Sequence, residues 1–341
     1  MQSRLTRGLV LVLGLALTGA GCGKYSIGNL RALKAFQDAN QKYQKGEFKA
    51  AAEDYQRVVE YNPDMGYAYF FLGNSYDNLY KPAKKGEAEN DSYLPKAVEN
   101  YQKAIDKLEG NTENKAPEIR KLSFEYLIAA YGTDKLNDLD KALPIAQKLI
   151  AVEPNEPTNY QALGKLYEDA GRYDEAEAQF KKAIEVKQND ALAYATLAGF
   201  YSRQGNFEKT MEAWDSRAKM EPNNPEAWHT IGASYQDEVF QNSKLPPGKQ
   251  KLSPAKQKEY VLAGIAAEDK ALAINPEYYE ALIFKNILLR LQANVEKDPA
   301  VQKRLIAEAD ELHSKGEQVQ KKQNAAAAAT AAAAPKKGAG K

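Results

Sequence analysis

Thiols are nearly absent from this chain, because Cys22 is the only cysteine in 341 residues. A single cysteine excludes an internal disulfide framework, a cysteine-rich zinc site and a redox pair of the C-x-x-C type. Histidine is almost as scarce, since His229 and His313 are the only two, which leaves little for metal binding or proton transfer. Charge of one sign is also lacking: 47 basic and 46 acidic side chains give a formal charge of +1. The sequence therefore has no basic field of the kind that gathers nucleic acid.

Long apolar runs are lacking as well. Residues 8–17 form an apolar run of ten residues, which follows Arg4 and Arg7 and precedes the small residues 18–21. A membrane span needs about 20 apolar residues. A basic start, a short apolar run and small residues are instead typical of a secretory signal peptide. The sequence thus predicts an exported protein with a signal peptide over residues 1–21.

Residues 19–22 (GAGC) resemble the lipobox of bacterial lipoproteins, although Gly19 stands where that motif usually has leucine. The resemblance implies that Cys22 is the lipidation site, carrying a diacylglyceryl group with palmitate-type chains, and that residues 22–30 are a lipidated linker. An ordinary secretory signal cut after Ala20, which would leave Cys22 as a free thiol, is the alternative. The next residue is Gly23 and not the aspartate that retains some lipoproteins in the inner membrane. The resemblance therefore implies the cell outer membrane, facing the periplasm.

A recurring pattern of small and large apolar residues occupies residues 160–184. Its apolar residues recur at steps of three and four on both sides of Gly171, which predicts two amphipathic helices joined by a turn. The pattern resembles the tetratricopeptide repeat, a helix–turn–helix unit of about 34 residues. The resemblance rests on these residues: Leu163, Gly164, Tyr167, Gly171, Tyr173, Ala176, Phe180 and Ala183.

The resemblance implies an all-α solenoid of about six repeats over residues 31–276, closed by C-terminal capping helices over 277–316. Insertions at about 81–94 and 240–257 interrupt two repeats at the turn between their helices. These insertions are interpreted as solvated loops, with partner binding as the alternative. Residues 317–341 are rich in alanine and lysine and are predicted to be a low-complexity, disordered tail.

Catalytic motifs are missing from the sequence. It contains no G-x-S-x-G, P-loop, H-E-x-x-H or dinucleotide fingerprint. The acidic stretch Glu87, Glu89 and Asp91 lacks the glycine and the terminal glutamate of a calcium loop. We therefore expect no enzyme activity, cofactor, metal site or small-molecule substrate. A hydrolase or transferase with its active site in the interrupted loops is the less favoured alternative.

What a solenoid of this family offers is a surface, because the first helices of its repeats line a concave groove. Tyr67 and Phe70 are predicted as an aromatic anchor for a partner side chain. Asn74 matches part of the lysine–asparagine clamp that some members of the family use for a terminal carboxylate, but Phe70 replaces the lysine. Helical spacing predicts the following partner-binding groove residues: Tyr67, Phe70, Asn74, Asn78, Gln161, Lys165, Arg203, His229 and Gln236.

Together these patterns predict a membrane-anchored periplasmic scaffold that binds protein or peptide partners in its groove. By resemblance, such lipoproteins act as envelope assembly factors. The alternative is a pilotin-type lipoprotein that escorts one membrane protein of a pilus or secretion system. The sequence identifies no partner, and neither nucleic acid nor a cofactor is expected.

Overall fold

The computed structural model describes residues 27–113, 115–246, 248–249 and 251–333, and these ranges contain helices and no β-strand. The predicted all-α fold is confirmed. The chain forms two compact units, Met1–Gln179 (unit 1) and Phe180–Lys341 (unit 2). Cys22, the predicted signal peptide and residues 334–341 lie outside the described residues. Within the described ranges, no helix combines the length and the apolar character needed to cross a membrane.

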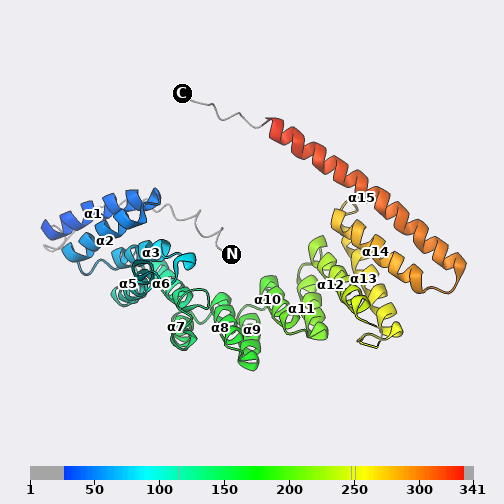
Figure 1. Cartoon of the computed structure of the whole chain (residues 1–341), viewed down its shortest axis with the longest axis horizontal. Coiled ribbons are helices and arrows are strands. Elements are labelled where there is room, and N and C mark those ends of the chain that lie inside the picture. Colours follow the sequence, from blue (N-terminus) through cyan, green and yellow to red (C-terminus); the bar gives the residue numbers. More distant parts are fainter. Residues whose placement is uncertain (1–26, 114, 247, 250, 334–341) are drawn as a thin grey trace. The chain divides into compact units, whose positions relative to one another are not determined.

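Unit 1 consists of antiparallel helix hairpins that follow one another along the chain (Figure 1). α1 (Ile27–Gln44) pairs with α2 (Phe48–Tyr61), and α3 (Gly66–Leu79) pairs with α5 (Tyr93–Lys107). α6 (Ala116–Tyr131) pairs with α7 (Leu139–Val152), which packs on α8 (Pro157–Asp169). α9 (Tyr173–Val186) contains the boundary between the units. α1 thus begins inside the segment predicted as a linker.

Unit 2 continues the same hairpin design. α10 (Ala191–Arg203) pairs with α11 (Phe207–Met220), and α12 (Pro225–Lys244) pairs with α13 (Pro254–Ile274). The last pair is α14 (Tyr279–Val295) with α15 (Pro299–Ala333). The predicted repeats that lie within one unit, the degenerate third one included, coincide with helix pairs.

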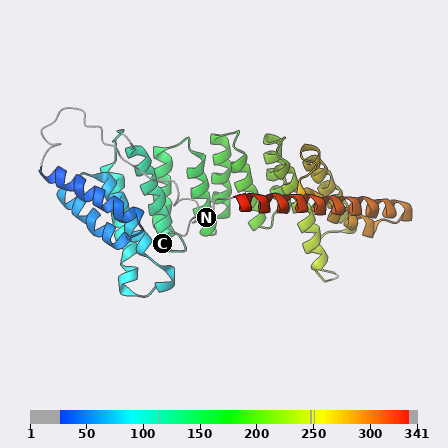
Figure 2. The same ribbon diagram turned by 90° about the horizontal axis from the view of Figure 1, so that it is seen from above.

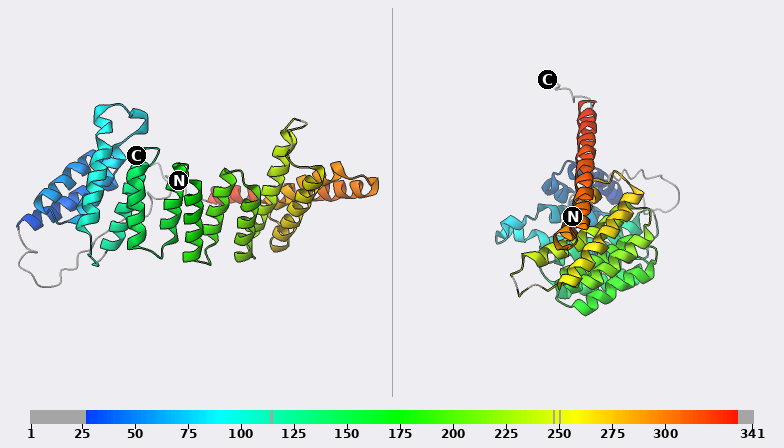
Figure 3. Two further views of the ribbon diagram at one scale, coloured as in Figure 1. Left: turned by 90° about the horizontal axis from the view of Figure 1, so that it is seen from below. Right: turned by 90° about the vertical axis from the view of Figure 1, so that its right-hand side faces the viewer.

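The two insertions differ from each other in structure. In unit 1 the insertion forms the short helices η2 (Pro82–Lys84) and α4 (Ala88–Asp91), and it projects from the ends of α3 and α5 (Figure 2). The Asn90 side chain fixes its start, because its oxygen accepts a hydrogen bond from the Lys81 backbone at 2.8 Å. In unit 2 about half of the insertion is helix, since its two ends lengthen α12 and α13 (Figure 3). The prediction of a solvated loop from residue 240 onward was wrong for those helical turns.

The C-terminal helix also differs from its prediction. Disorder was expected from residue 317, but α15 runs without interruption to Ala333. Its turns near Gly316 pack closely on α14, because a Cβ at Gly316 would lie 2.9 Å from the Ile283 side chain, and Val319 is buried. Lys322 pairs with Glu277 at 2.7 Å. These contacts and the high helix propensity of alanine extend the helix.

A glycine in a left-handed conformation closes the hairpin between α10 and α11. Gly205 has φ +68° and donates to the Ser202 carbonyl, while the Asn206 N–H reaches back to the Tyr201 carbonyl; both bonds are 3.0 Å long. This pair of bonds caps the helix end, and only glycine adopts the required φ without strain. Gly46 and Gly171 close their hairpins in the same way. The glycine that the sequence predicted at the turn thus has a conformational cause.

Replacing Gly205 with alanine is expected to lower the free energy of unfolding of unit 2 by about 1–2 kcal/mol. The cause is backbone strain alone, since nothing lies within 4 Å of the added Cβ. Urea unfolding can be followed by the fluorescence of Trp214 and Trp228, both of which belong to unit 2. Gly199→Ala is the matched control, because its Cβ would meet only the flexible end of Arg203. A larger loss at Gly199 than at Gly205 would contradict this explanation.

Candidate functional site

The C-terminal half of α3 carries a set of linked polar side chains. Asn74 accepts a hydrogen bond from the Tyr43 hydroxyl of α1 and donates one to the Tyr101 hydroxyl of α5 across 3.4 Å. One turn further on, the Asn78 amide donates to the Asn74 backbone and side-chain oxygens, both at 2.8 Å. Asn74 therefore connects three helices of unit 1.

Asp77 extends this set toward the loop after α6. It accepts a hydrogen bond from Lys135 at 2.5 Å and another from the Tyr101 hydroxyl at 3.4 Å. Burial, and then the nearby Asp77 charge, raise the pKa of Tyr101 far above its ordinary value, so its hydroxyl stays protonated. We call Tyr43, Asn74, Asp77, Asn78, Tyr101 and Lys135 the α3 polar cluster. Its groups can orient one another and offer hydrogen bonds, but it contains no activated nucleophile.

Phe70 lies one turn before this cluster, inside an aromatic core. Its ring contacts Tyr101 and, edge to face at a centroid distance of 5.7 Å, Tyr126 of α6. Only 3% of Phe70 and 3% of Asn74 are exposed. The α3 polar cluster and this core together fasten α1, α3, α5 and α6 to one another.

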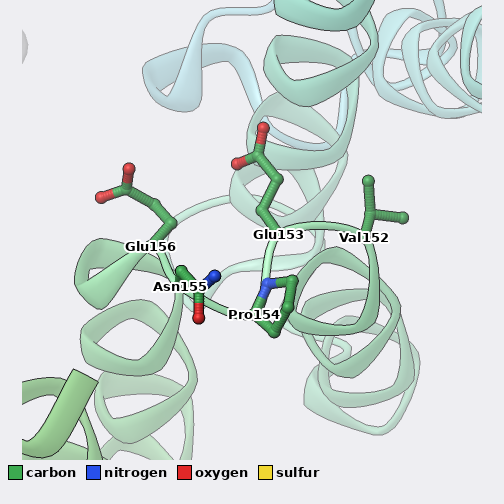
Figure 4. A pocket seen from close by; sticks show the side chains of 5 residues that line it. All are labelled: Val152, Glu153, Pro154, Asn155 and Glu156. Carbon is green, nitrogen blue, oxygen red and sulfur yellow. The ribbon is translucent and has the colours of Figure 1, made fainter.

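A shallow pocket of about 380 Å³ lies in the loop between α7 and α8. It is lined by Val152, Glu153, Pro154, Asn155 and Glu156, and the side chains of Glu153 and Glu156 extend away from the loop backbone (Figure 4). Both acids are already engaged: Lys121 lies 3.0 Å from Glu153 and 3.7 Å from Glu156. Glu156 also accepts a hydrogen bond from the Thr158 hydroxyl. This hydrogen bond is the main cause that lowers the pKa of Glu156, and the nearby charge of Lys121 lowers it further. Glu156 therefore stabilises the start of α8, and the pocket is not an acid–base site.

Glu268 of α13 in unit 2 is a fully buried acid, with an exposed fraction of 0%. The Nδ1 atom of His229 on α12 lies 3.0 Å from one of its oxygens and 3.1 Å from the other. Burial raises the pKa of Glu268 to about 7, although His229 opposes this shift. The rings of Tyr278 and Phe284 meet the His229 ring edge to face. Gly232 leaves the space for Glu268, since a Cβ there would lie 2.3 Å from its carboxylate.

Comparison with known protein families finds a match to the central helix hairpins. Two overlapping stretches, residues 135–198 and 169–234, match the family described as tetratricopeptide repeat. Residues 135–234 of this chain belong to the tetratricopeptide repeat family. The matched stretches carry the same residues that supported the resemblance in the sequence, and the helix pairs before and after them repeat the hairpin design. The comparison with curated proteins gives no match.

Solved tetratricopeptide repeat structures are similar to this chain in fold. The C-terminal part of a repeat-containing protein from Cytophaga hutchinsonii is 13% identical, with a TM-score of 0.52, and the match covers 84% of this chain and 98% of that one. A repeat protein from Parabacteroides merdae is 16% identical over 82% of this chain and 99% of its own, with a TM-score of 0.43. YrrB, described as having an unusual peptide-binding site, is 23% identical over 58% and 91%, with a TM-score of 0.39.

The predicted groove residues of this chain lie in different environments. Phe70 and Asn74 are buried, so the prediction of an open aromatic anchor was wrong at Phe70. Neighbouring first helices cover these positions because they contribute large aromatic residues, Tyr43 and Tyr126. Tyr67 is only partly buried and lies 3.4 Å from the Glu113 carbonyl.

The other predicted groove residues reach the surface to different extents. Gln161, Asn78 and Gln236 are partly exposed, and Arg203 is exposed. Lys165 is exposed and pairs with Asp169 at 2.6 Å and with Glu168 at 3.3 Å. His229 is mostly enclosed by its contacts with Glu268, Tyr278 and Phe284. Partner binding by these residues stays a prediction.

Sequence reasoning missed two groups of residues. Lys135 lies in the loop of the degenerate third repeat and pairs with Asp77. The repeat spacing does not define the positions of loop residues, so it could not predict this ion pair. Glu268 carried a usable signal, because it stands on the face of α13 that also presents the buried Val261, Gly264 and Ala271. An acid on an apolar helix face needs a buried partner. Among the described residues, no cluster of three or more His, Cys, Asp or Glu side chains could hold a metal ion.

Proposed function

We propose that this chain is a lipid-anchored scaffold of the bacterial cell envelope, tethered through Cys22 and facing the periplasm from the outer membrane. The tetratricopeptide repeat fold supports a protein-interaction scaffold. On this proposal the partners are protein or peptide chains, bound on the first helices of the hairpins, and the protein serves as an envelope assembly factor and not as an enzyme.

One observation carries the binding part of the proposal. α8 lies within the first stretch that matches the family. It presents Gln161 and Lys165 one turn apart, and its other side is buried through Leu163, Leu166 and Tyr167. An amide can donate to and accept from an extended backbone. Lys165 can exchange Asp169, which is exposed, for a carboxylate of a partner. The exposed hydrogen-bonding side chains of α8 are therefore suited to binding a polar peptide segment.

Crosslinking in whole cells tests this proposal. A photoreactive amino acid at Gln161 is expected to give discrete adducts, which mass spectrometry identifies. The matched control is the same substitution at Lys148, which is exposed on α7, the second helix of the preceding hairpin. Equal labelling at both positions, or no adduct at Gln161, would argue against a groove partner. Recovery of several envelope proteins favours an assembly scaffold, whereas a single membrane protein favours the pilotin-type alternative.

A further inference from the structure

The outer stripe of α1 begins with two large apolar side chains in open solvent. Ile27 is 70% exposed and Leu30 is 54% exposed. They lie three residues apart and hence on one face of the helix. The opposite face of α1 buries Ala32, Phe36 and Ala39 against the rest of unit 1. α1 is the first helix of the array, so no earlier hairpin covers this stripe within the described residues.

The same stripe continues with basic side chains. Arg31 and Lys34 follow at helical spacing and are both exposed. No acidic residue occurs over residues 27–37, and Asp38 is the first acid of α1. The first turns of α1 therefore combine apolar and cationic groups on one side. That combination fits the surface of a bilayer that contains anionic lipid.

The position of this stripe along the chain limits what can reach it. Only residues 23–26 separate Cys22 from Ile27. A fully extended chain advances about 3.3–3.6 Å per residue, so the Cα atoms of Cys22 and Ile27 are at most about 18 Å apart. If the acyl chains of Cys22 are embedded in a bilayer, α1 starts within reach of its headgroups.

We propose that the first turns of α1 form a second membrane contact, with Ile27 and Leu30 inserted among the lipids and Arg31 and Lys34 against anionic headgroups. This inference rests on the proposed anchoring at Cys22. It deepens that proposal, because a short tether alone would leave the hairpin of α1 and α2 free to rotate over the membrane. Two contact points give the hairpin a defined orientation.

The lipidated full-length chain, reconstituted into vesicles of phosphatidylethanolamine and phosphatidylglycerol, provides the test. Acylation blocks the thiol of Cys22, so a Leu30→Cys variant carries one reactive thiol for a nitroxide spin label. Gln41→Cys is the matched control, because Gln41 is exposed on the same stripe, about 16 Å further along the helix. We expect oxygen, which concentrates in the bilayer, to collide with the label at position 30 more often than a water-soluble nickel chelate does. The order should be reversed at position 41.

The outcomes separate the inference from the anchoring on which it rests. Chains that do not associate with the vesicles overturn both. Chains that associate but give the same nickel accessibility at positions 30 and 41 overturn the membrane contact alone. Exclusion of both reagents at position 30 would mean that a protein covers the stripe, and it also overturns the lipid contact. In the Leu30→Cys chain, Arg31→Gln with Lys34→Gln should shift the label toward water, since each basic side chain favours an anionic surface by about fivefold.

Discussion

Replacing Cys22 with serine is expected to move the protein from the membrane fraction to the soluble fraction of the cell. A single acyl chain binds a bilayer with a constant of only about 10⁴ M⁻¹, whereas two or three chains make attachment effectively permanent. Serine has no thiol to accept the diacylglyceryl group. The described helices contain no membrane-spanning segment that could replace the lost anchor. The contact proposed for Ile27 and Leu30 is too small to hold the chain alone.

Cell fractionation and the mass of the N-terminal peptide measure this effect. Gly19→Leu is the matched control, because it introduces the leucine that the lipobox usually contains and should preserve acylation at Cys22. A Cys22→Ser chain that still sediments with the membrane would show that attachment does not depend on this thiol. An unmodified Cys22 in the wild-type chain would favour the ordinary secretory signal.

The stability of unit 2 is expected to fall as the pH rises from about 4.5 to about 7, because Glu268 must lose its proton in a buried site. Burial raises its pKa in the folded chain from 4.5 to about 7. The folded state therefore binds this proton more tightly than the unfolded state does. The stabilisation is fully present below pH 4.5 and is lost as the pH rises through 7. At 1.36 kcal/mol per pKa unit, the change amounts to about 3 kcal/mol.

Urea unfolding at several pH values, followed by tryptophan fluorescence, reports this change because Trp214 and Trp228 both lie in unit 2. Glu268→Gln keeps the shape and the hydrogen-bonding capacity at His229 but removes the titrating proton. Its stability should therefore be flatter between pH 5 and pH 8 than that of the wild-type chain. The other ionisable neighbours, His229 and Asp269, remain in both chains. Parallel pH profiles would show that Glu268 does not titrate in this range.

Local sequence patterns predicted the hairpins because each unit repeats the same local causes. Small residues such as Gly73 sit where helices approach closely: a Cβ there would lie 3.0 Å from the Ala97 carbonyl oxygen. Gly46, Gly171 and Gly205 have the positive φ that the turns require. Both causes act within one hairpin, so the spacing of residues in a repeat reveals them.

The side-chain environments could not be predicted in the same way. Phe70 and Asn74 occupy positions that face outward in a single repeat, and the residues that bury them, Tyr43 and Tyr126, come from the adjacent hairpins. Burial of Glu268 depends on His229, which lies 39 residues earlier in the chain. α15 continues past residue 316 because Glu277 and Ile283 of the preceding segment meet it. Contacts between residues far apart in the sequence decide these cases, and they leave no periodic pattern in it.

The pairing of helices with their neighbours along the chain also affects how the protein folds. Among the described helices, those that pack together belong to the same hairpin or to consecutive hairpins, within unit 1 and likewise within unit 2. Native contacts of this kind span short loops, so their closure costs little chain entropy and folding is fast. Each hairpin can form as soon as its second helix is available, and the next hairpin then packs on a finished surface. Folding can therefore follow the order in which the chain appears, without waiting for the C-terminus.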